Sequence, residues 1–321
     1  MNRSPMGLDE QTSGLLASIT TPDAIPFHQM PLAQARAQVQ QFCRAVAPAF
    51  PAAWRQHNRL IDAHDRELSI AVYWPEQSDR CDKLPCILVF HGGGFALGDY
   101  LDCDPLCRYL CRHTPAVIIS LDYRLAPEHR FPSALDDANF LLQWVVDNAS
   151  SLGIDKKQLV VLGESAGANL AVALCHFARD RQGPSIAMQI ALYPWLDLRP
   201  HSRYESRQRY GGGEYFFSMA DLAWLSAMYL GRRTSPDNPY VSPLLDSSFK
   251  NLPPTLVVSA GFDPLRDDAL LYSRYLTQNN IPVTHRCFEH TIHGFIAFAG
   301  ALDEGKAGLE FVLKTIRSQL S

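Results

Sequence analysis

The chain has 321 residues, enough for one large α/β domain or for two smaller ones. Its composition is that of an ordinary globular protein, with 47% hydrophobic and 19% charged residues and a formal net charge of -4. This charge, without any basic run, argues against a nucleic-acid partner. No apolar stretch approaches the roughly 20 residues that span a bilayer. The N-terminal residues lack the apolar core of a signal peptide, so we expect a cytoplasmic protein without membrane insertion.

Eight cysteines are scattered along the chain rather than set in a disulfide framework, which fits a reducing compartment. Cys103, Cys107 and Cys111 follow one another at every fourth position, which places them on one face of a helix. Their spacing differs from that of zinc sites. We therefore expect packed thiols and no metal.

The first part of the chain predicts an arm, a helix and two strands. Residues 1 to about 25 are polar and predict a loose arm or part of a lid. Residues 31–48 have apolar residues near one face, which indicates a helix. The alternating stretch Leu68–Trp74 is typical of an antiparallel edge strand. Residues 85–90 are continuously apolar and predict a central strand.

Three glycines follow that strand directly, in the sequence HGGGF of residues 91–95. Successive glycines expose backbone N–H groups with no side chain in the way, and such a loop forms part of the oxyanion hole in some hydrolases. We expect Gly93 and Gly94 to supply these donors, the alternative being a plain flexible turn. His91 is expected to shape the loop by hydrogen bonding.

Strands and helices alternate beyond this loop. A helix is predicted over 102–113, a buried strand over 116–121 and a helix over 134–148, which indicates a mostly parallel sheet with helices on both faces. The loop of residues 122–132 is rich in charged residues and proline. We expect its carboxylates and Arg124 to form ion pairs that fix the loop beside the functional site.

The sequence LVVLGESAG, residues 159–167, predicts a strand followed by a sharp turn into a helix. A serine between two glycines at such a turn is the pattern of a nucleophile elbow, which here presents the Ser165 hydroxyl. Gly163 and Gly167 let strand and helix approach closely. The N–H of Ala166 would complete the oxyanion hole. An ordinary glycine-rich turn is the alternative. Glu164 flanks the serine and could bind nearby polar backbone groups, and its role stays open.

After a strand over 186–193, residues 194–245 break the alternation with an insertion rich in aromatic side chains. Insertions after strands carry lids and substrate loops in α/β enzymes. Two interpretations remain open: the aromatic residues line an acyl pocket, or they only pack the lid onto the body.

Two further strands each precede a candidate catalytic residue. The strand over 254–260 is followed by Asp263, and the strand over 283–288 is followed by His293. With Ser165, this is the nucleophile–acid–histidine order of α/β-hydrolases, with each side chain just past the end of a strand. His293 would take the proton of the Ser165 hydroxyl and pass it to a leaving alcohol, while Asp263 would orient the imidazole.

Neighbouring residues offer alternatives to two members of this set. His290 lies three positions before His293, but Gly294 gives His293 the tight turn that it needs. Asp267 and Asp268 suit the start of the next helix, predicted over 270–278, where acidic residues favour the helix dipole. A last helix is predicted over 309–320.

Five motifs in this order resemble the hormone-sensitive-lipase family of α/β-hydrolases, most closely its bacterial acetyl-esterase type. They are HGGGF at 91–95, DYRLAPEHRFP at 122–132, GESAGAN at 163–169, DPLRDD at 263–268 and HGF at 293–295. The resemblance runs from about residue 60 to the C-terminus. It implies a single α/β-hydrolase domain over 1–321, with a mostly parallel central sheet flanked by helices and a helical cap from about 1–50 and 195–245.

The resemblance also implies an activity, namely hydrolysis of small-molecule carboxylic esters with short acyl chains, without a cofactor. Ser165, Asp263 and His293 would be the catalytic residues. The oxyanion hole would consist of Gly93, Gly94 and Ala166. Many members have Asp where this chain has Glu164, which leaves the subgroup open, and a monomer or a homodimer is expected. An amidase with the same triad, or a regulatory binding protein on the same scaffold, are the alternatives.

Overall fold

The computed structural model describes residues 7–20, 24–50, 55–62, 67–75 and 83–320. In these ranges the strands form one eight-stranded sheet in the order β1-β2-β4-β3-β5-β6-β7-β8. Pairing is antiparallel from β1 to β2 and from β2 to β4, and parallel across the rest of the sheet. The strands are β1 (Arg55–Asp62), β2 (Glu67–Trp74), β3 (Leu84–Phe90), β4 (Val117–Asp122), β5 (Ile154–Glu164), β6 (Met188–Leu192), β7 (Thr255–Phe262) and β8 (Val283–Ile292).

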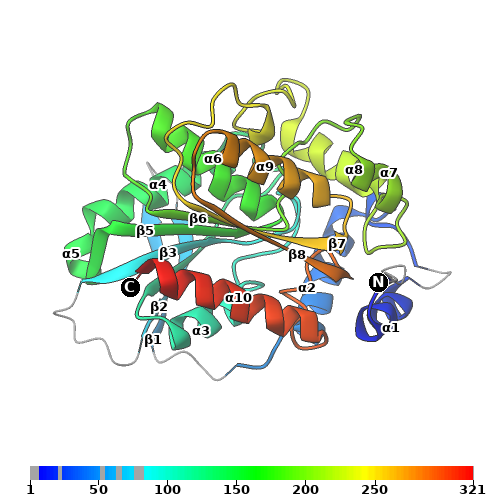
Figure 1. Ribbon diagram of the computed structural model, residues 1–321, viewed down its shortest axis with the longest axis horizontal. Coiled ribbons are helices and arrows are strands. Elements are labelled where there is room, and N and C mark those ends of the chain that lie inside the picture. The colour runs from blue at the N-terminus through cyan, green and yellow to red at the C-terminus, as the bar shows by residue number, and fades with distance from the viewer. Residues whose placement is uncertain (1–6, 21–23, 51–54, 63–66, 76–82, 321) are drawn as a thin grey trace.

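Helices cover both faces of this sheet, as the alternating sequence pattern predicts (Figure 1). One face carries α3 (Asp104–His113) and α10 (Asp303–Leu320), and the other carries α4 (Ser133–Asp147), α6 (Ala166–Asp180) and α9 (Arg266–Gln278). The central strands read as continuous apolar runs because both of their faces are buried under these helices. The short helix α5 (Ala149–Leu152) leads into β5.

The edge of the sheet differs from the prediction. The expected edge strand, β2, lies between β1 and β4, so β1 is the edge. Residues 70–73 of β2 are all buried, since this strand is covered on both faces. The sequence of β1, RQHNRLID, is mostly polar and lacks the apolar alternation that predicts a strand.

The N-terminal arm is also more ordered than predicted. It contains the helix α1 (Glu10–Ile19), which begins after Asp9, whose carboxylate accepts the N–H of Thr12 at 2.7 Å. An aspartate at this position satisfies an amide that the helix leaves free, so the signal was present in the sequence. Other parts of the predicted arm, residues 1–6 and 21–23, lie outside the described residues.

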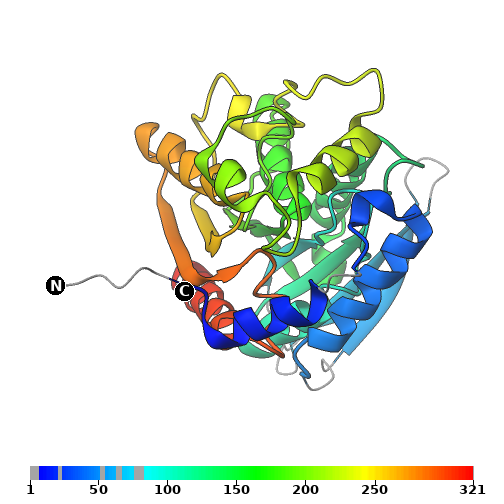
Figure 2. The same cartoon turned by 90° about the vertical axis from the view of Figure 1, so that its right-hand side faces the viewer.

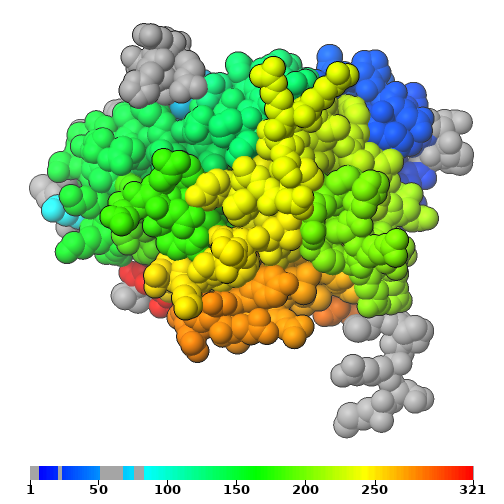
Figure 3. Space-filling view, turned by 90° about the horizontal axis from the view of Figure 1, so that it is seen from above, coloured from blue at the N-terminus to red at the C-terminus, as the bar shows by residue number. Residues whose placement is uncertain are grey.

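Segments distant in sequence meet beyond the carboxyl ends of β7 and β8 (Figures 1 and 2). They comprise α1, η1 (Phe27–Gln29) and α2 (Leu32–Val46) from the N-terminal part, and α7 (Glu205–Tyr210) and α8 (Met219–Leu230) from the insertion. The His28 imidazole of η1 lies 2.8 Å from the Asp221 carboxylate of α8. After α8 the chain crosses the face seen in Figure 3, where it appears yellow between the green helices and orange α9, and it forms η2 (Pro243–Leu245).

The three cysteines at every fourth position are buried. Cys103 precedes α3, while Cys107 and Cys111 lie within it. Burial raises the pKa of the Cys111 thiol to about 12, so it stays neutral. Among the described residues, no three histidine, cysteine or carboxylate side chains come together as metal ligands would. Within the same ranges, no helix has both the length and the apolar character that crossing a membrane requires.

Candidate active site

Ser165 stands at the turn between β5 and α6 in a strained backbone conformation, with φ 55° and ψ -114°. Its N–H donates to the Leu192 carbonyl at 2.9 Å. Both flanking glycines are needed. A Cβ on Gly163 would lie 2.0 Å from the Gly167 carbonyl oxygen, and a Cβ on Gly167 would lie 2.2 Å from that of Phe90. The turn therefore has the close strand–helix approach that the motif predicts.

Ser165, His293 and Asp263 form one hydrogen-bonded chain. His293 Nε2 lies 2.9 Å from Ser165 Oγ, and His293 Nδ1 lies 2.8 Å from Asp263 Oδ2. Asp263 is fully buried, and its other oxygen accepts the N–H of Leu265 at 2.7 Å. An aspartate facing Nδ1 keeps the proton on that nitrogen, which leaves Nε2 free to accept the serine proton. The arrangement can thus activate a serine hydroxyl.

Aromatic rings enclose the imidazole of His293. The Phe217 ring lies edge-on with its centroid 4.8 Å away, and the Tyr193 ring lies at 5.0 Å. Only 6% of His293 is exposed to solvent. The next residue, Gly294, has φ 80°, which is the tight turn that the sequence predicts. These contacts restrict the imidazole to the orientation that faces Ser165.

The alternatives to His293 and Asp263 make other contacts. His290 hydrogen-bonds through Nδ1 to the Gly7 carbonyl at 2.9 Å. Asp267 accepts the N–H of Ser206, the second residue of α7, at 2.9 Å. Asp268 is buried, pairs with Arg207 at 3.0 Å and accepts the N–H of Leu196. The two aspartates therefore hold the insertion onto α9, as residues at the start of this helix.

The loop of three glycines lies beside the nucleophile. A Cβ on Gly92 would stand 3.6 Å from Ser165 Cβ. Gly93 and Gly94 have φ values of 102° and 61°, and Leu225 of α8 packs so closely that a Cβ on Gly94 would lie 2.5 Å from it. The sequence must therefore be glycine here. Ala166, the third expected donor, is the first residue of α6.

His91 has the shaping role expected of it. Its ring is fully buried and stacks on Tyr123, with centroids 4.1 Å apart, and Nδ1 lies 2.7 Å from the Gly92 carbonyl. Burial lowers the pKa of His91 to about 4, so the ring is neutral and Nδ1 donates. The Tyr123 hydroxyl donates to the His91 carbonyl at 2.8 Å. These bonds fix the start of the glycine loop.

Arg124 forms an ion pair, but with a helix rather than within its own loop. Its guanidinium contacts Asp137 of α4 at 2.6 and 2.8 Å, and its backbone N–H donates to the same carboxylate. Within the loop, Glu128 pairs instead with Arg36 of α2 at 2.8 Å. Arg36 also donates to the carbonyl of Ala96, which follows the glycine loop. The predicted network thus extends to α4 and α2.

An aromatic cluster joins three separate segments near His293. The Phe216 ring lies tilted against Phe42 of α2, with centroids 5.7 Å apart, and meets Phe298, beyond β8, edge-to-face at 5.4 Å. Phe217 follows directly and contacts His293. The sequence pointed to the aromatic residues of the insertion, but not to Phe42 or Phe298. Only the fold brings these two rings to the site.

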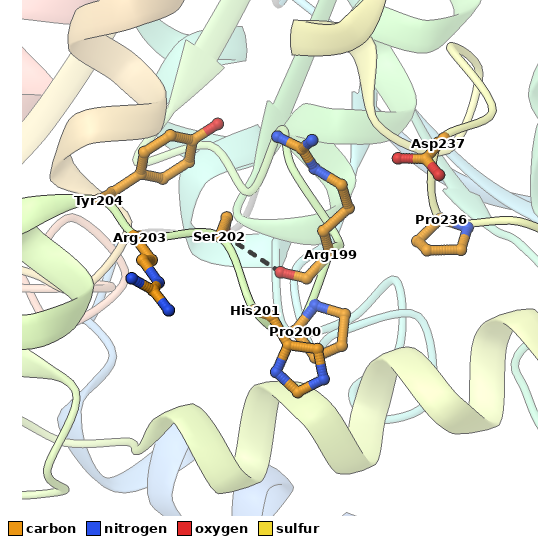
Figure 4. A pocket seen from close by; sticks show the side chains of 8 residues that line it. All are labelled: Arg199, Pro200, His201, Ser202, Arg203, Tyr204, Pro236 and Asp237. Carbon is orange, nitrogen blue, oxygen red and sulfur yellow. Dashed lines mark hydrogen bonds between the residues drawn. The ribbon is translucent and has the colours of Figure 1, made fainter.

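A separate surface pocket is lined by residues of the insertion (Figure 4). The guanidinium of Arg199 pairs there with Asp197 at 2.8 Å, and the Ser202 hydroxyl donates to the Arg199 carbonyl at 3.1 Å. Ser165, Asp263 and His293 are not among its lining residues, which are Arg199, Pro200, His201, Ser202, Arg203, Tyr204, Pro236 and Asp237.

Comparison with known proteins places the chain in a family. The sequence profile of the alpha/beta hydrolase fold family matches residues 87–297, and the chain belongs to this family. The predicted fold and the resemblance to its hormone-sensitive-lipase type are thereby confirmed.

Related proteins match most of the chain. It is 36% identical over 243 residues to carboxylic ester hydrolase LipN of Mycobacterium tuberculosis, a match that covers 74% of this chain and 64% of LipN, under two thirds of that relative. It is 31% identical over 298 residues to ethyl acetate hydrolase of Pseudomonas putida, a match that covers 92% of this chain and 93% of that enzyme. The solved structure of an esterase from Pyrobaculum calidifontis superposes on this chain with a TM-score of 0.91 at 32% sequence identity. The match covers 98% of this chain and 99% of that esterase.

Proposed function

We propose that this chain is a serine carboxylesterase that hydrolyses small esters with short acyl chains. The observation that carries the proposal is the hydrogen-bonded chain from Ser165 through His293 to the buried Asp263. Relatives named carboxylic ester hydrolase and ethyl acetate hydrolase support the reaction class. The reaction needs only the ester and water, and we expect it in the cytoplasm, with the chain as a monomer or homodimer.

The proposed reaction has two halves. In the first, Ser165 Oγ attacks the ester carbonyl while His293 Nε2 takes its proton, and the N–H groups of Gly93, Gly94 and Ala166 bind the oxyanion. The tetrahedral intermediate then breaks its bond to the alkoxy group, which leaves as the alcohol with the proton from His293. In the second half a water attacks the acyl-enzyme with the same base and releases the carboxylic acid.

The acyl preference is inferred from the aromatic cluster of Phe42, Phe216, Phe217 and Phe298. The Phe217 ring contacts His293, and Phe42 and Phe298 pack on the neighbouring Phe216, so that the cluster limits the room for a long acyl chain. We assign Phe42, Phe216 and Phe217 to a cap formed by residues of about 1–50 and 195–245. The two segments contact one another through His28 and Asp221, and each reaches the glycine loop or the residue that follows it, through Arg36 and Leu225.

The test is hydrolysis of p-nitrophenyl esters from acetate to palmitate by the wild-type chain and by Ser165→Ala. We expect maximal kcat/KM at acetate or butyrate and loss of turnover in the variant, with its thermal unfolding temperature retained. A maximum at palmitate would overturn the short-chain assignment. No turnover of any ester would favour the amidase or the binding-protein alternative, and amide substrates would then separate these two.

A further inference from the structure

Glu164 directly precedes the candidate nucleophile and takes no part in the proposed reaction. It is the last residue of β5 and only 7% exposed. Burial and the charge of Asp102 raise the pKa of Glu164 to about 7. A carboxyl group in this position is costly to ionise, so its presence beside the nucleophile requires an explanation.

Tyr193 lies between Glu164 and the candidate catalytic histidine. Its ring is buried and packs edge-on against His293 at 5.0 Å. The sheet places the two residues next to each other, since Glu164 of β5 pairs with Leu192 of β6, the residue before Tyr193. The Tyr193 hydroxyl lowers the pKa of the Glu164 carboxyl against the effect of burial, and it has no hydrogen-bond partner among the described residues. The backbone is anchored, since the Tyr193 N–H donates to the Val258 carbonyl at 2.6 Å, with φ 38°. Tyr193 is therefore a fixed spacer between a carboxyl group and the imidazole.

We propose that Glu164 is a positioning residue that acts on His293 through Tyr193. Its negative charge acts across the tyrosine ring and stabilises the imidazolium that forms when His293 accepts the Ser165 proton. The inference rests on the proposed function, because it assumes that His293 is the base.

Few other titratable groups bear on this carboxyl. Asp102, in the loop before α3, is its charged neighbour and has a pKa raised to about 6 by burial, so it ionises first. Three thiols lie within reach of the Glu164 charge, and burial raises the pKa of each, so they stay neutral. They belong to Cys43 of α2, Cys103 just before α3 and Cys107 within α3. Around His293 the groups are Asp263, Ser165 and Tyr193. Ionisation of the Glu164 carboxyl near pH 7 is therefore the change in charge that acts on the His293 imidazole from the side of Tyr193.

The experiment compares the wild type with Glu164→Gln, Glu164→Asp, Tyr193→Phe and the Gln/Phe double variant. Turnover of p-nitrophenyl acetate is measured from pH 5.5 to 9. Asp122→Asn is the matched control, because Asp122 ends β4, two strands from β5, and burial also raises its carboxyl pKa to about 6.

We expect kcat of Glu164→Gln to match the wild type below pH 6, where both side chains are neutral. Above pH 8 it should be about fivefold to tenfold lower, with KM unchanged. Glu164→Asp should restore the wild-type profile. The kcat of Tyr193→Phe should be lower than that of the wild type. The kcat of the double variant should be no lower than that of the poorer single variant. The control should keep the wild-type profile.

A ratio of wild-type kcat to Glu164→Gln kcat that stays constant with pH would overturn the inference, since a merely structural residue acts equally at every pH. A change confined to KM would do the same. If the wild type hydrolyses no ester, the proposed function fails. If it does so and only these pH effects are missing, the inference alone fails.

Discussion

The ring of Phe217 meets the imidazole of His293 edge-to-face, with the two centroids 4.8 Å apart. Phe217 precedes α8 in the insertion, whereas His293 follows β8 of the sheet. The insertion therefore contacts the candidate base directly. Phe216, one residue earlier, packs on Phe42 of α2, so that the N-terminal helix is joined to the same contact.

Replacement of Phe217 should affect both the orientation of the His293 imidazole and the space for the acyl chain. An edge-to-face aromatic pair contributes about 0.5–1.5 kcal/mol beyond its buried area. We therefore expect Phe217→Ala to lower kcat/KM for p-nitrophenyl acetate by roughly twofold to tenfold. The chain-length optimum should move to longer acyl groups. Phe217→Leu is the control, which fills the volume without the ring. An unchanged optimum in the alanine variant would contradict a boundary role for Phe217.

Asp263 should matter for rate far more than for folding. In Asp263→Asn the amide no longer selects the tautomer in which His293 Nε2 accepts a proton. Such a change lowers kcat by about 10⁴ in a serine protease with this triad. We expect a loss on that order here, with KM and the unfolding temperature little changed. Asp267→Asn is the neighbouring control and should retain most of its kcat. Comparable losses in both variants would contradict the assignment of Asp263.

Arg124 should be a stability residue because its partner is buried. Asp137 is 1% exposed. In Arg124→Ala the Asp137 carboxylate would keep its bond to the backbone N–H of residue 124 but would lose its cation. Removal of one member of a buried pair costs about 3–5 kcal/mol of unfolding free energy. The exposed pair Lys306–Asp303, at 2.7 Å, is the control, and Lys306→Ala should leave the free energy of unfolding almost unchanged, because solvent screens this pair. Urea unfolding measures both. Equal losses would show that burial does not matter here.

Glu164 should make stability depend on pH. Its pKa rises from 4.5 to about 7 in the folded chain, so the fold favours the protonated form. The folded chain then binds more protons than the unfolded one, and stability falls as pH rises from about 4.5 to 7. The difference above pH 7 is on the order of 3 kcal/mol. Glu164→Gln should therefore gain stability over the wild type between pH 5 and pH 8 in urea unfolding. A constant difference between the two proteins would contradict the raised pKa.

Much of the sheet could be predicted from the sequence because buried parallel strands read as apolar runs. This holds for β3 to β7 and for α3, α4 and α6 between them, whereas α7 and α8 were not predicted as separate helices within the insertion. The polar β1 could not be predicted because its sequence has no apolar alternation, and without it β2 is predicted to be the edge strand. The helix α1 escaped although Asp9 marks its start.

The candidate site could also be predicted in part from the sequence. Ser165, Asp263 and His293 each follow a strand in a recognisable motif, so their meeting at one sheet edge could be expected. The contacts between distant segments could not be expected. Neither the ring of Tyr193 on His293 nor Phe42 on Phe216 has a local signal, because each depends on how two loops pack in three dimensions.

The central claim is that Ser165 is the nucleophile, and covalent labelling tests it most directly. A fluorophosphonate reacts when the serine oxygen attacks phosphorus and fluoride leaves, which gives a stable adduct that intact-protein mass spectrometry and peptide mapping locate. We predict one adduct per chain on Ser165, parallel loss of ester hydrolysis, and no adduct in Ser165→Ala. An adduct on another residue, or hydrolysis that persists in the Ser165→Ala variant, would contradict the account.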